Sequence, residues 1–107
     1  MSDTLKRIIT LVGQGEVRIS EHGYDELAAD RILVRDLIAG LPDGEPLEDY
    51  ASFPKGPCVL VLQQDREGKP VHAVWGIPKG ESSPAVLVTA YRPDPERWTE
   101  DFRSRKT

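Results

Sequence analysis

Cysteine and histidine are scarce in this sequence, and long apolar runs are absent from it. A single cysteine, Cys58, excludes an intramolecular disulfide and a cysteine-rich zinc site. The two histidines, His22 and His72, lie far apart in the sequence, with no HxxxH or paired-carboxylate spacing that would indicate a zinc or iron site. No apolar run approaches the roughly 20 residues that span a bilayer, and no secretory signal peptide is evident. We therefore expect a cytoplasmic protein without a metal, a cofactor or a membrane partner.

Positive charge is also in short supply. Fourteen Lys and Arg residues against eighteen Asp and Glu residues give a formal net charge of −4 at pH 7. A protein that binds nucleic acid through a broad face normally needs an excess of positive charge on that face. The composition argues against that mode of binding, although it allows a small basic site on an acidic surface.

The length and composition indicate one folded domain. With 107 residues, 38% of them hydrophobic and 30% charged, the chain is typical of a globular protein that buries a single core. We expect a domain over residues 1–107, with its core at about 17–95. An N-terminal helix at 1–16 and a C-terminal helix and tail at 93–107 extend that core.

The N-terminal half favours three helices. Apolar residues recur at helical spacing over residues 3–14. Ser20 is a favourable N-cap for a second helix that runs to about residue 30. A third helix is predicted over residues 34–39, where Gly40 ends it.

From Glu45 onward the pattern changes to short apolar runs separated by turns with Gly and Pro. Four strands are predicted, EPLEDY, CVLVLQQD, PVHAVWGI and AVLVTAY, while Val17–Ile19 reads as a short extended piece. Trp98 and Phe102 stand four residues apart after the N-cap residue Asp94, which predicts a short C-terminal helix. The expected fold class is α+β, with the N-terminal helices packed on one face of a four-stranded antiparallel sheet.

The end of the last strand carries groups suited to binding a phosphodiester. Thr89, Tyr91 and Arg92 offer a hydroxyl, a phenol and a guanidinium there, although this is also an ordinary way to end an edge strand. Strand alternation places His72 opposite the apolar face of its own strand, and it groups Leu87 with Thr89 and Tyr91. His72, Thr89 and Tyr91 converge if the open faces of the two strands coincide, which depends on a register that the sequence does not give.

Three further side chains are candidates for chemistry. His22 lies in the first turn of a helix, where the dipole favours the neutral ring that a general base needs, and Glu26 lies one turn later. Alternatively, His22 only packs at the helix entry. Arg92 and Lys79 are candidates for holding a phosphate. The alternatives are a solvated lysine and a surface ion pair of Arg92 with Asp94, Glu96 or Asp49.

Four segments carry a family resemblance: ISEHGYDELAADRI, VRDLIAGL, HAVWGI and VLVTAYRPD. With them the chain resembles an uncharacterised bacterial family of domains of unknown function related to RelE-, MqsR- and BrnT-like toxins. The resemblance implies a barnase- or RelE-like fold, RNA cleavage as the activity and a zinc-finger antitoxin as the partner. Members usually carry arginines along the helix that bears the histidine, roughly where Glu26 and Asp30 stand in this chain.

Two functions follow as hypotheses. The first is a metal-independent endoribonuclease of a toxin–antitoxin pair, with RNA and an antitoxin as partners. Its predicted catalytic residues are His72, Arg92, Tyr91 and His22, and its predicted substrate-binding residues are Thr89 and Lys79. The alternative is a non-catalytic protein-interaction module: a decayed toxin, a regulatory partner or a homodimer. The acidic composition and the missing helix arginines favour the alternative.

Overall fold

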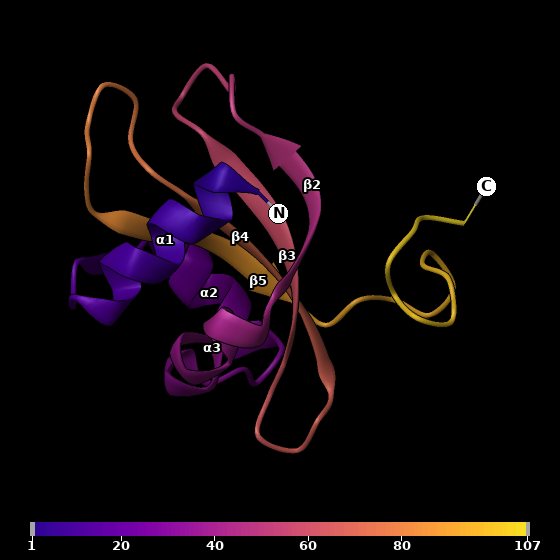
Figure 1. Ribbon diagram of the computed structural model, residues 1–107. Coiled ribbons are helices and arrows are strands. Elements are labelled where there is room, and N and C mark those ends of the chain that lie inside the picture. Colours follow the sequence, from indigo (N-terminus) through magenta and orange to yellow (C-terminus); the bar gives the residue numbers. More distant parts are fainter. Residues whose placement is uncertain (1, 107) are drawn as a thin grey trace.

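Three helices lie on one side of a five-stranded mixed sheet in the computed structural model, which describes residues 2–106 (Figure 1). The helices are α1 (Asp3–Gly13), α2 (Glu21–Ala29) and α3 (Val34–Gly40), and a short 3-10 turn, η1 (Leu41–Asp43), follows them. The strands are β1 (Val17–Ile19), β2 (Glu45–Tyr50), β3 (Cys58–Gln64), β4 (Pro70–Gly76) and β5 (Ala85–Tyr91). The expected α+β class is confirmed.

The sheet differs from the four antiparallel strands that the sequence predicts. Its order is β1-β5-β4-β3-β2, and β1 pairs in parallel with β5 through Val17 and Ala85. All other neighbouring strands are antiparallel. The short extended piece at Val17–Ile19 is thus a fifth strand. Three residues carry too little alternation to predict pairing, and their partner strand lies far along the chain.

The start of α2 is fixed against β5. The Ser20 hydroxyl accepts a hydrogen bond from the Gly23 amide at 2.9 Å, as expected of an N-cap, and donates one to the Val88 carbonyl at 2.7 Å. A Cβ atom on Gly23 would lie 2.9 Å from the Leu87 carbonyl oxygen. The absence of a side chain at Gly23 therefore lets the helix approach the strand closely.

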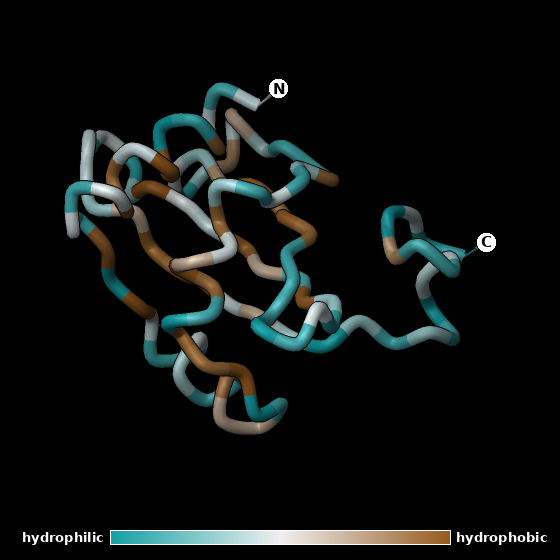
Figure 2. Tube along the Cα trace, turned by 60° about the horizontal axis from the view of Figure 1, so that its bottom comes forward, coloured by the Kyte–Doolittle hydropathy of each residue, from teal (hydrophilic) through white to brown (hydrophobic). Residues whose placement is uncertain are grey.

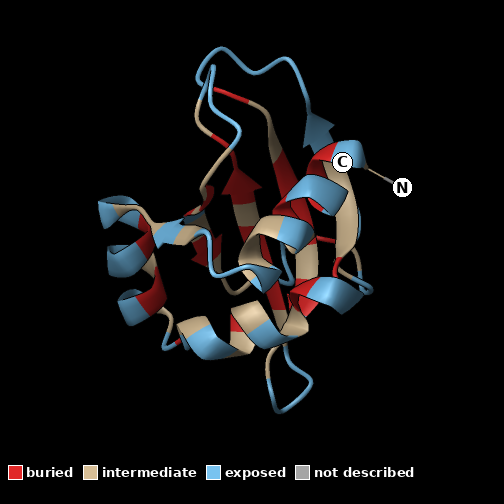
Figure 3. Cartoon of the chain, turned by 60° about the vertical axis from the view of Figure 1, so that its left-hand side comes forward, coloured by how far each residue is buried: buried red, intermediate tan, exposed pale blue. Residues whose placement is uncertain are grey.

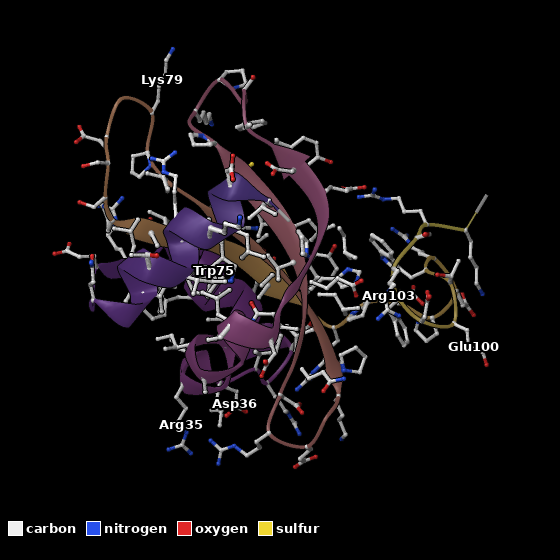
Figure 4. The ribbon with its side chains drawn as sticks, viewed as in Figure 1. Arg35, Asp36, Trp75, Lys79, Glu100 and Arg103 are labelled. Carbon is white, nitrogen blue, oxygen red and sulfur yellow. The ribbon has the colours of Figure 1, made fainter. Side chains whose placement is uncertain are left out.

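The hydrophobic core lies between the helices and the sheet, as the buried segments in Figure 3 show. Trp75 is its largest fully buried side chain (labelled in Figure 4), and hydrophobic residues concentrate along the strands (Figure 2). One buried amide crosses this core. Gln63 on β3 accepts a hydrogen bond from the Trp75 indole at 2.8 Å and donates one to the Leu37 carbonyl at 2.8 Å. This amide connects two strands with α3.

A β-bulge at Val88 decides which side chains of β5 share a face. The strand pairing passes from Val74↔Thr89 to Trp75↔Leu87, which leaves Val88 as the extra residue. Leu87 is therefore buried with the core, whereas Thr89 and Tyr91 belong to the face of the sheet turned away from the helices. The predicted grouping of Leu87 with Thr89 and Tyr91 is wrong, because strict alternation does not hold across a bulge. We call the face turned away from the helices the helix-free face.

The predicted C-terminal helix is also wrong. Asp94 caps only one turn, through a 2.8 Å hydrogen bond from the Glu96 amide, and the chain then forms an irregular loop closed by a bridge between Trp98 and Arg105. Phe102 in this loop has a φ of 60°, which no helix tolerates. We call residues 94–106 the C-terminal loop; it lies on the opposite side of the sheet from the helices (Figure 1). Trp98 packs against the sheet, and this contact outweighs the helical spacing of Trp98 and Phe102.

Candidate functional site

His72 lies on the helix-free face, and all its polar atoms have internal partners. Its strand register pairs it with Tyr91, whose hydroxyl lies 3.3 Å from Nδ1, and Nε2 lies 2.9 Å from the Phe102 carbonyl oxygen. A carbonyl can only accept, so Nε2 carries the hydrogen, and Nδ1 of the neutral ring accepts from Tyr91. The side chain is fully buried, and this burial lowers the pKa of His72. The imidazole is therefore held neutral and oriented.

The C-terminal loop forms the cover over His72. The Trp98 ring packs edge-on against the imidazole with 4.2 Å between ring centroids, and Trp98 is 6% exposed. Two ion pairs join the loop to β2: Arg103 Nε lies 2.6 Å from Glu45 Oε2, and Arg105 pairs with Glu48 (Figure 4 labels Arg103). Both pairs are largely exposed, and ion pairs in contact with water contribute little to stability. The buried contact of Trp98 with His72 thus holds the loop more firmly than its charges do.

Glu48 and Arg105 add charged groups to this half of the helix-free face, and neither was a predicted site residue. The hydrogen bond from Arg105 lowers the pKa of Glu48, and the Tyr50 hydroxyl donates a further hydrogen bond to Glu48 at 2.7 Å. The same hydrogen bond raises the pKa of Tyr50. The two-residue spacing of Glu48 and Tyr50 in EPLEDY is a signal that both belong to one face. No feature of the sequence indicates that Arg105 folds back onto them.

Arg92 is an internal ion-pair partner, although it lines a cavity of about 650 Å³ together with Tyr91, Trp98 and Arg105. Its Nη1 is 2.9 Å from Asp65 Oδ2, and its amide donates to Asp30 Oδ2 at 2.8 Å. Asp65 in turn accepts hydrogen bonds from the amides of Glu67 and Lys69, both at 2.9 Å, in the turn between β3 and β4. The predicted alternative of an ion pair is found, but with Asp65 in place of Asp94, Glu96 or Asp49.

Lys79 and His22 lie elsewhere. Lys79 is exposed in the loop after β4, beyond the end of that strand opposite to His72 (Figure 4). His22 is exposed on α2, with Nε2 3.7 Å from Glu26 Oε1. Because α2 and His72 lie on opposite faces of the sheet, the sheet separates the two histidines. Of the six predicted site residues, the structure brings His72 and Tyr91 into contact and places Thr89 on the same face. Arg92 shares the lining of a cavity with Tyr91 but pairs with Asp65, and Lys79 and His22 do not join them.

The half of the helix-free face that the C-terminal loop leaves uncovered forms an apolar groove of about 320 Å³. Its apolar side chains come from the loop between β2 and β3 and from strands β3, β4 and β5: Phe53, Pro57, Cys58, Val74, Val86 and Val88. Phe53 is 47% exposed and Val88 38% exposed, and Arg18 and Lys55 line the rim. Burial raises the pKa of the Cys58 thiol, so at neutral pH it is a protonated apolar group and no nucleophile.

One wall of the apolar groove is held by backbone hydrogen bonds. The loop between β2 and β3 meets the segment after β4 through Ile77 N to Pro57 O at 3.0 Å and Lys79 N to Lys55 O at 3.1 Å. Gly56, which has a φ of 122°, lets the loop between β2 and β3 come this close to the segment after β4. A Cβ atom at Gly56 would lie 2.1 Å from the Ile77 carbonyl oxygen. The apolar groove is therefore a preformed feature of the fold.

Within residues 2–106, no group of three or more His, Cys, Asp or Glu side chains is arranged to hold a metal ion. None of the helices in that range combines the length and the apolar character that crossing a bilayer requires.

Comparison with known proteins gives one match. A family model described as a domain of unknown function, DUF4258, matches residues 19–92. No curated protein and no solved structure matches the chain. The matched region includes the predicted site residues and the apolar groove from Phe53 to Val88, and it ends at Arg92, before the C-terminal loop begins.

Proposed function

The chain belongs to the DUF4258 family, a domain of unknown function, and we propose that it is a non-catalytic protein-interaction module that binds its partner through the helix-free face of the sheet. The observation that carries this proposal is the apolar groove. Binding sites are typically preformed, concave and lined mainly by apolar side chains, as this groove is. Phe53 and Val88 remain exposed in the apolar groove. On the other half of the same sheet face, the C-terminal loop buries His72 beneath Trp98.

The state of His72 speaks against catalysis. A general acid or base must come within hydrogen-bond reach of the proton it transfers. His72 is fully buried, its Nε2 donates to the Phe102 carbonyl and its Nδ1 faces the Tyr91 hydroxyl. These are the contacts of a histidine that fixes the C-terminal loop to the sheet.

The charges speak against a phosphate substrate. Arg92, the strongest predicted phosphate ligand, is neutralised by Asp65, and its backbone is tied to Asp30. Arg103 and Arg105 are likewise paired with Glu45 and Glu48 on the strand below them. A chain of net charge −4 in which Arg92, Arg103 and Arg105 are already paired offers little attraction to RNA at this half of the sheet.

The endoribonuclease of a toxin–antitoxin pair is the second candidate, and one observation favours it. Glu48, His72, Tyr91 and Arg105 gather on one half of the helix-free face. A carboxylate, an imidazole and a guanidinium are the groups that RNA cleavage needs as base, acid and charge stabiliser. This function requires the C-terminal loop to leave His72, since RNA has no access to the ring beneath it.

Site-specific cross-linking tests the interaction function. A photoreactive amino acid replaces Val88 in the apolar groove or, as the control, the exposed Tyr24 on α2, in the full chain expressed in its natural host. We expect a discrete protein adduct from position 88 that is absent from position 24 and is lost when Val86→Asp is added. The partner, once identified and purified, should bind the unlabelled chain in calorimetry. Identical adducts from both positions, or none from position 88, would overturn the proposal.

Regulated expression in a bacterial host tests the ribonuclease function. Wild type is compared with His72→Ala, Arg92→Ala and, as an exposed control, His22→Ala, and total RNA is examined after induction. Growth arrest with RNA decay that His72→Ala abolishes and His22→Ala retains would replace the interaction function with catalysis. Normal growth with folded wild-type protein is the outcome we expect.

A further inference from the structure

We propose that the apolar groove takes an extended acidic segment of the partner, which places one large apolar side chain over Gly76. This inference rests on the interaction function proposed above and adds the chemistry of the occupant. It draws on three properties of the apolar groove: the apolar lining around Gly76, the charge at its rim and the scarcity of hydrogen-bonding groups between them.

Gly76, which ends β4, forms part of the floor of the apolar groove. A Cβ atom there would lie 3.2 Å from the Pro57 carbonyl oxygen, 3.3 Å from the Cys58 Cβ and 3.7 Å from the Val88 Cγ2. The floor is therefore closely packed at Gly76, and no side chain of that residue stands in the apolar groove. An apolar side chain of the partner that lies over this floor exchanges water for contacts with carbon.

The rim is cationic although the protein as a whole is acidic. Arg18 projects from β1, where its register partner is Val86, and Lys55 projects from the loop between β2 and β3. Within residues 2–106 neither takes part in an ion pair, whereas five arginines elsewhere are paired with carboxylates: Arg66, Arg92, Arg97, Arg103 and Arg105. The backbone of Lys79 is hydrogen-bonded to that of Lys55, which brings a third cationic residue to this end of the sheet.

Asp49 is a carboxylate near the apolar groove. Its charge contributes, after burial, to the raised pKa of Cys58, and it accepts a hydrogen bond from the Ser2 hydroxyl. A hydroxyl does not cancel that charge, so the carboxylates of a partner segment would face Arg18 and Lys55 rather than Asp49. Opposite charges at the rim of an interface mainly select the partner and speed its arrival.

The floor of the apolar groove favours a peptide over RNA. Valine, proline and a protonated thiol offer no donors or acceptors that distinguish base edges, and the cations lie at the rim only. A second copy of this chain is the other competitor, since Tyr24 is 58% exposed on α2 beside Asp25. The experiment below distinguishes both from the proposed occupant.

Two ten-residue peptides test the inference. Both carry Leu-Phe at the centre, flanked by Asp and Glu in one and by Lys in the other, and each is titrated into the ¹⁵N-labelled full chain at low salt. We expect the acidic peptide to shift the amide signals of Val74, Gly76, Val86 and Val88 and to bind about tenfold more tightly than the basic one, as two or three exposed charge pairs allow. A decanucleotide RNA should leave these signals unchanged.

Charge reversal supplies the matched control. Arg18→Glu combined with Lys55→Glu should invert the preference between the two peptides, while Arg31→Glu combined with Arg35→Glu, the same charge change on the helix side, should leave it intact. Any of five results would overturn the inference. With the peptides, these are equal binding of the two, no shift of the amide signals at millimolar peptide, or shifts that lie outside the apolar groove. The other two are binding of the RNA in the apolar groove and self-association of the chain through the apolar groove in sedimentation. If cross-linking from position 88 succeeds while the peptide preference fails, the interaction function stands and only the acidic occupant is wrong.

Discussion

The imidazole of His72 and the carbonyl of Phe102 form a 2.9 Å hydrogen bond that joins the middle of the sheet to the C-terminal loop. The bond holds the ring as the neutral Nε2–H form, with Trp98 packed against it. It accounts for a fully buried histidine without a metal or a substrate. It also makes the protonation of one side chain relevant to how firmly the loop is held.

Stability should fall as the pH drops below the ordinary pKa of histidine. Burial lowers the pKa of His72 from 6.5 in the folded state, more than its bond to Phe102 raises it. Above pH 6.5 both states are neutral. Below it the unfolded chain binds the proton first, so the free energy of unfolding declines until the folded state is protonated too. Urea unfolding at pH 7.0 and 5.5 should show this decline in wild type and a smaller one in His72→Gln. Equal declines in wild type and in His72→Gln would contradict the assignment.

Removing the aromatic cover should release the ring. In Trp98→Ala, water reaches His72, and the pKa of its imidazole should rise toward the ordinary value because burial is what lowers it. An NMR titration of the imidazole C–H signals measures this change. Hydrogen exchange of the Thr99 and Lys106 amides should speed up in the same variant, while that of β4 stays slow. Arg97→Ala, on an exposed side chain of the same loop, should change neither measurement.

Local signals in the sequence account for the helices. Ser20 caps α2 through the Gly23 amide, and Gly40 ends α3, as apolar spacing and capping chemistry predict. The sheet depends on contacts between distant segments. The parallel pairing of β1 with β5 and the bulge at Val88 have no local signature, so the sequence predicts one strand too few and groups Leu87 with the wrong neighbours.

The candidate site divides in the same way. Alternation within one strand is enough to set His72 apart from Trp75, and the observed register then brings Tyr91 beside it. The partner of Arg92 comes from the turn between β3 and β4, and Arg105 reaches Glu48 only because the C-terminal loop folds back over the sheet. Such contacts follow from tertiary packing, which a residue pattern does not encode.

Losing the buried amide should destabilise the core. Gln63→Leu leaves both the Trp75 indole N–H and the Leu37 carbonyl without their hydrogen bonds in a region closed to water. Each unsatisfied buried group costs about 1–3 kcal/mol, so we expect a loss of about 2–6 kcal/mol in the free energy of unfolding. The neighbouring Gln64 is exposed, and Gln64→Leu should stay within about 0.5 kcal/mol of wild type. A similar effect from both substitutions would show that the amide does not hold the core.

The wall of the apolar groove should depend on one glycine. Gly56→Ala places a Cβ atom 2.1 Å from the Ile77 carbonyl oxygen, so the loop between β2 and β3 must move away from the segment after β4. Gly68 also has a positive φ, but a Cβ atom there meets nothing within 4 Å, so Gly68→Ala shows backbone strain alone, about 1–2 kcal/mol. We expect Gly56→Ala to lose clearly more stability than Gly68→Ala in urea unfolding, and to shift the methyl signals of Val86 and Val88. Only Gly56→Ala should also weaken partner binding, since only it deforms the wall. Equal losses from the two variants would mean that the loop gives way freely and that the apolar groove is not preformed.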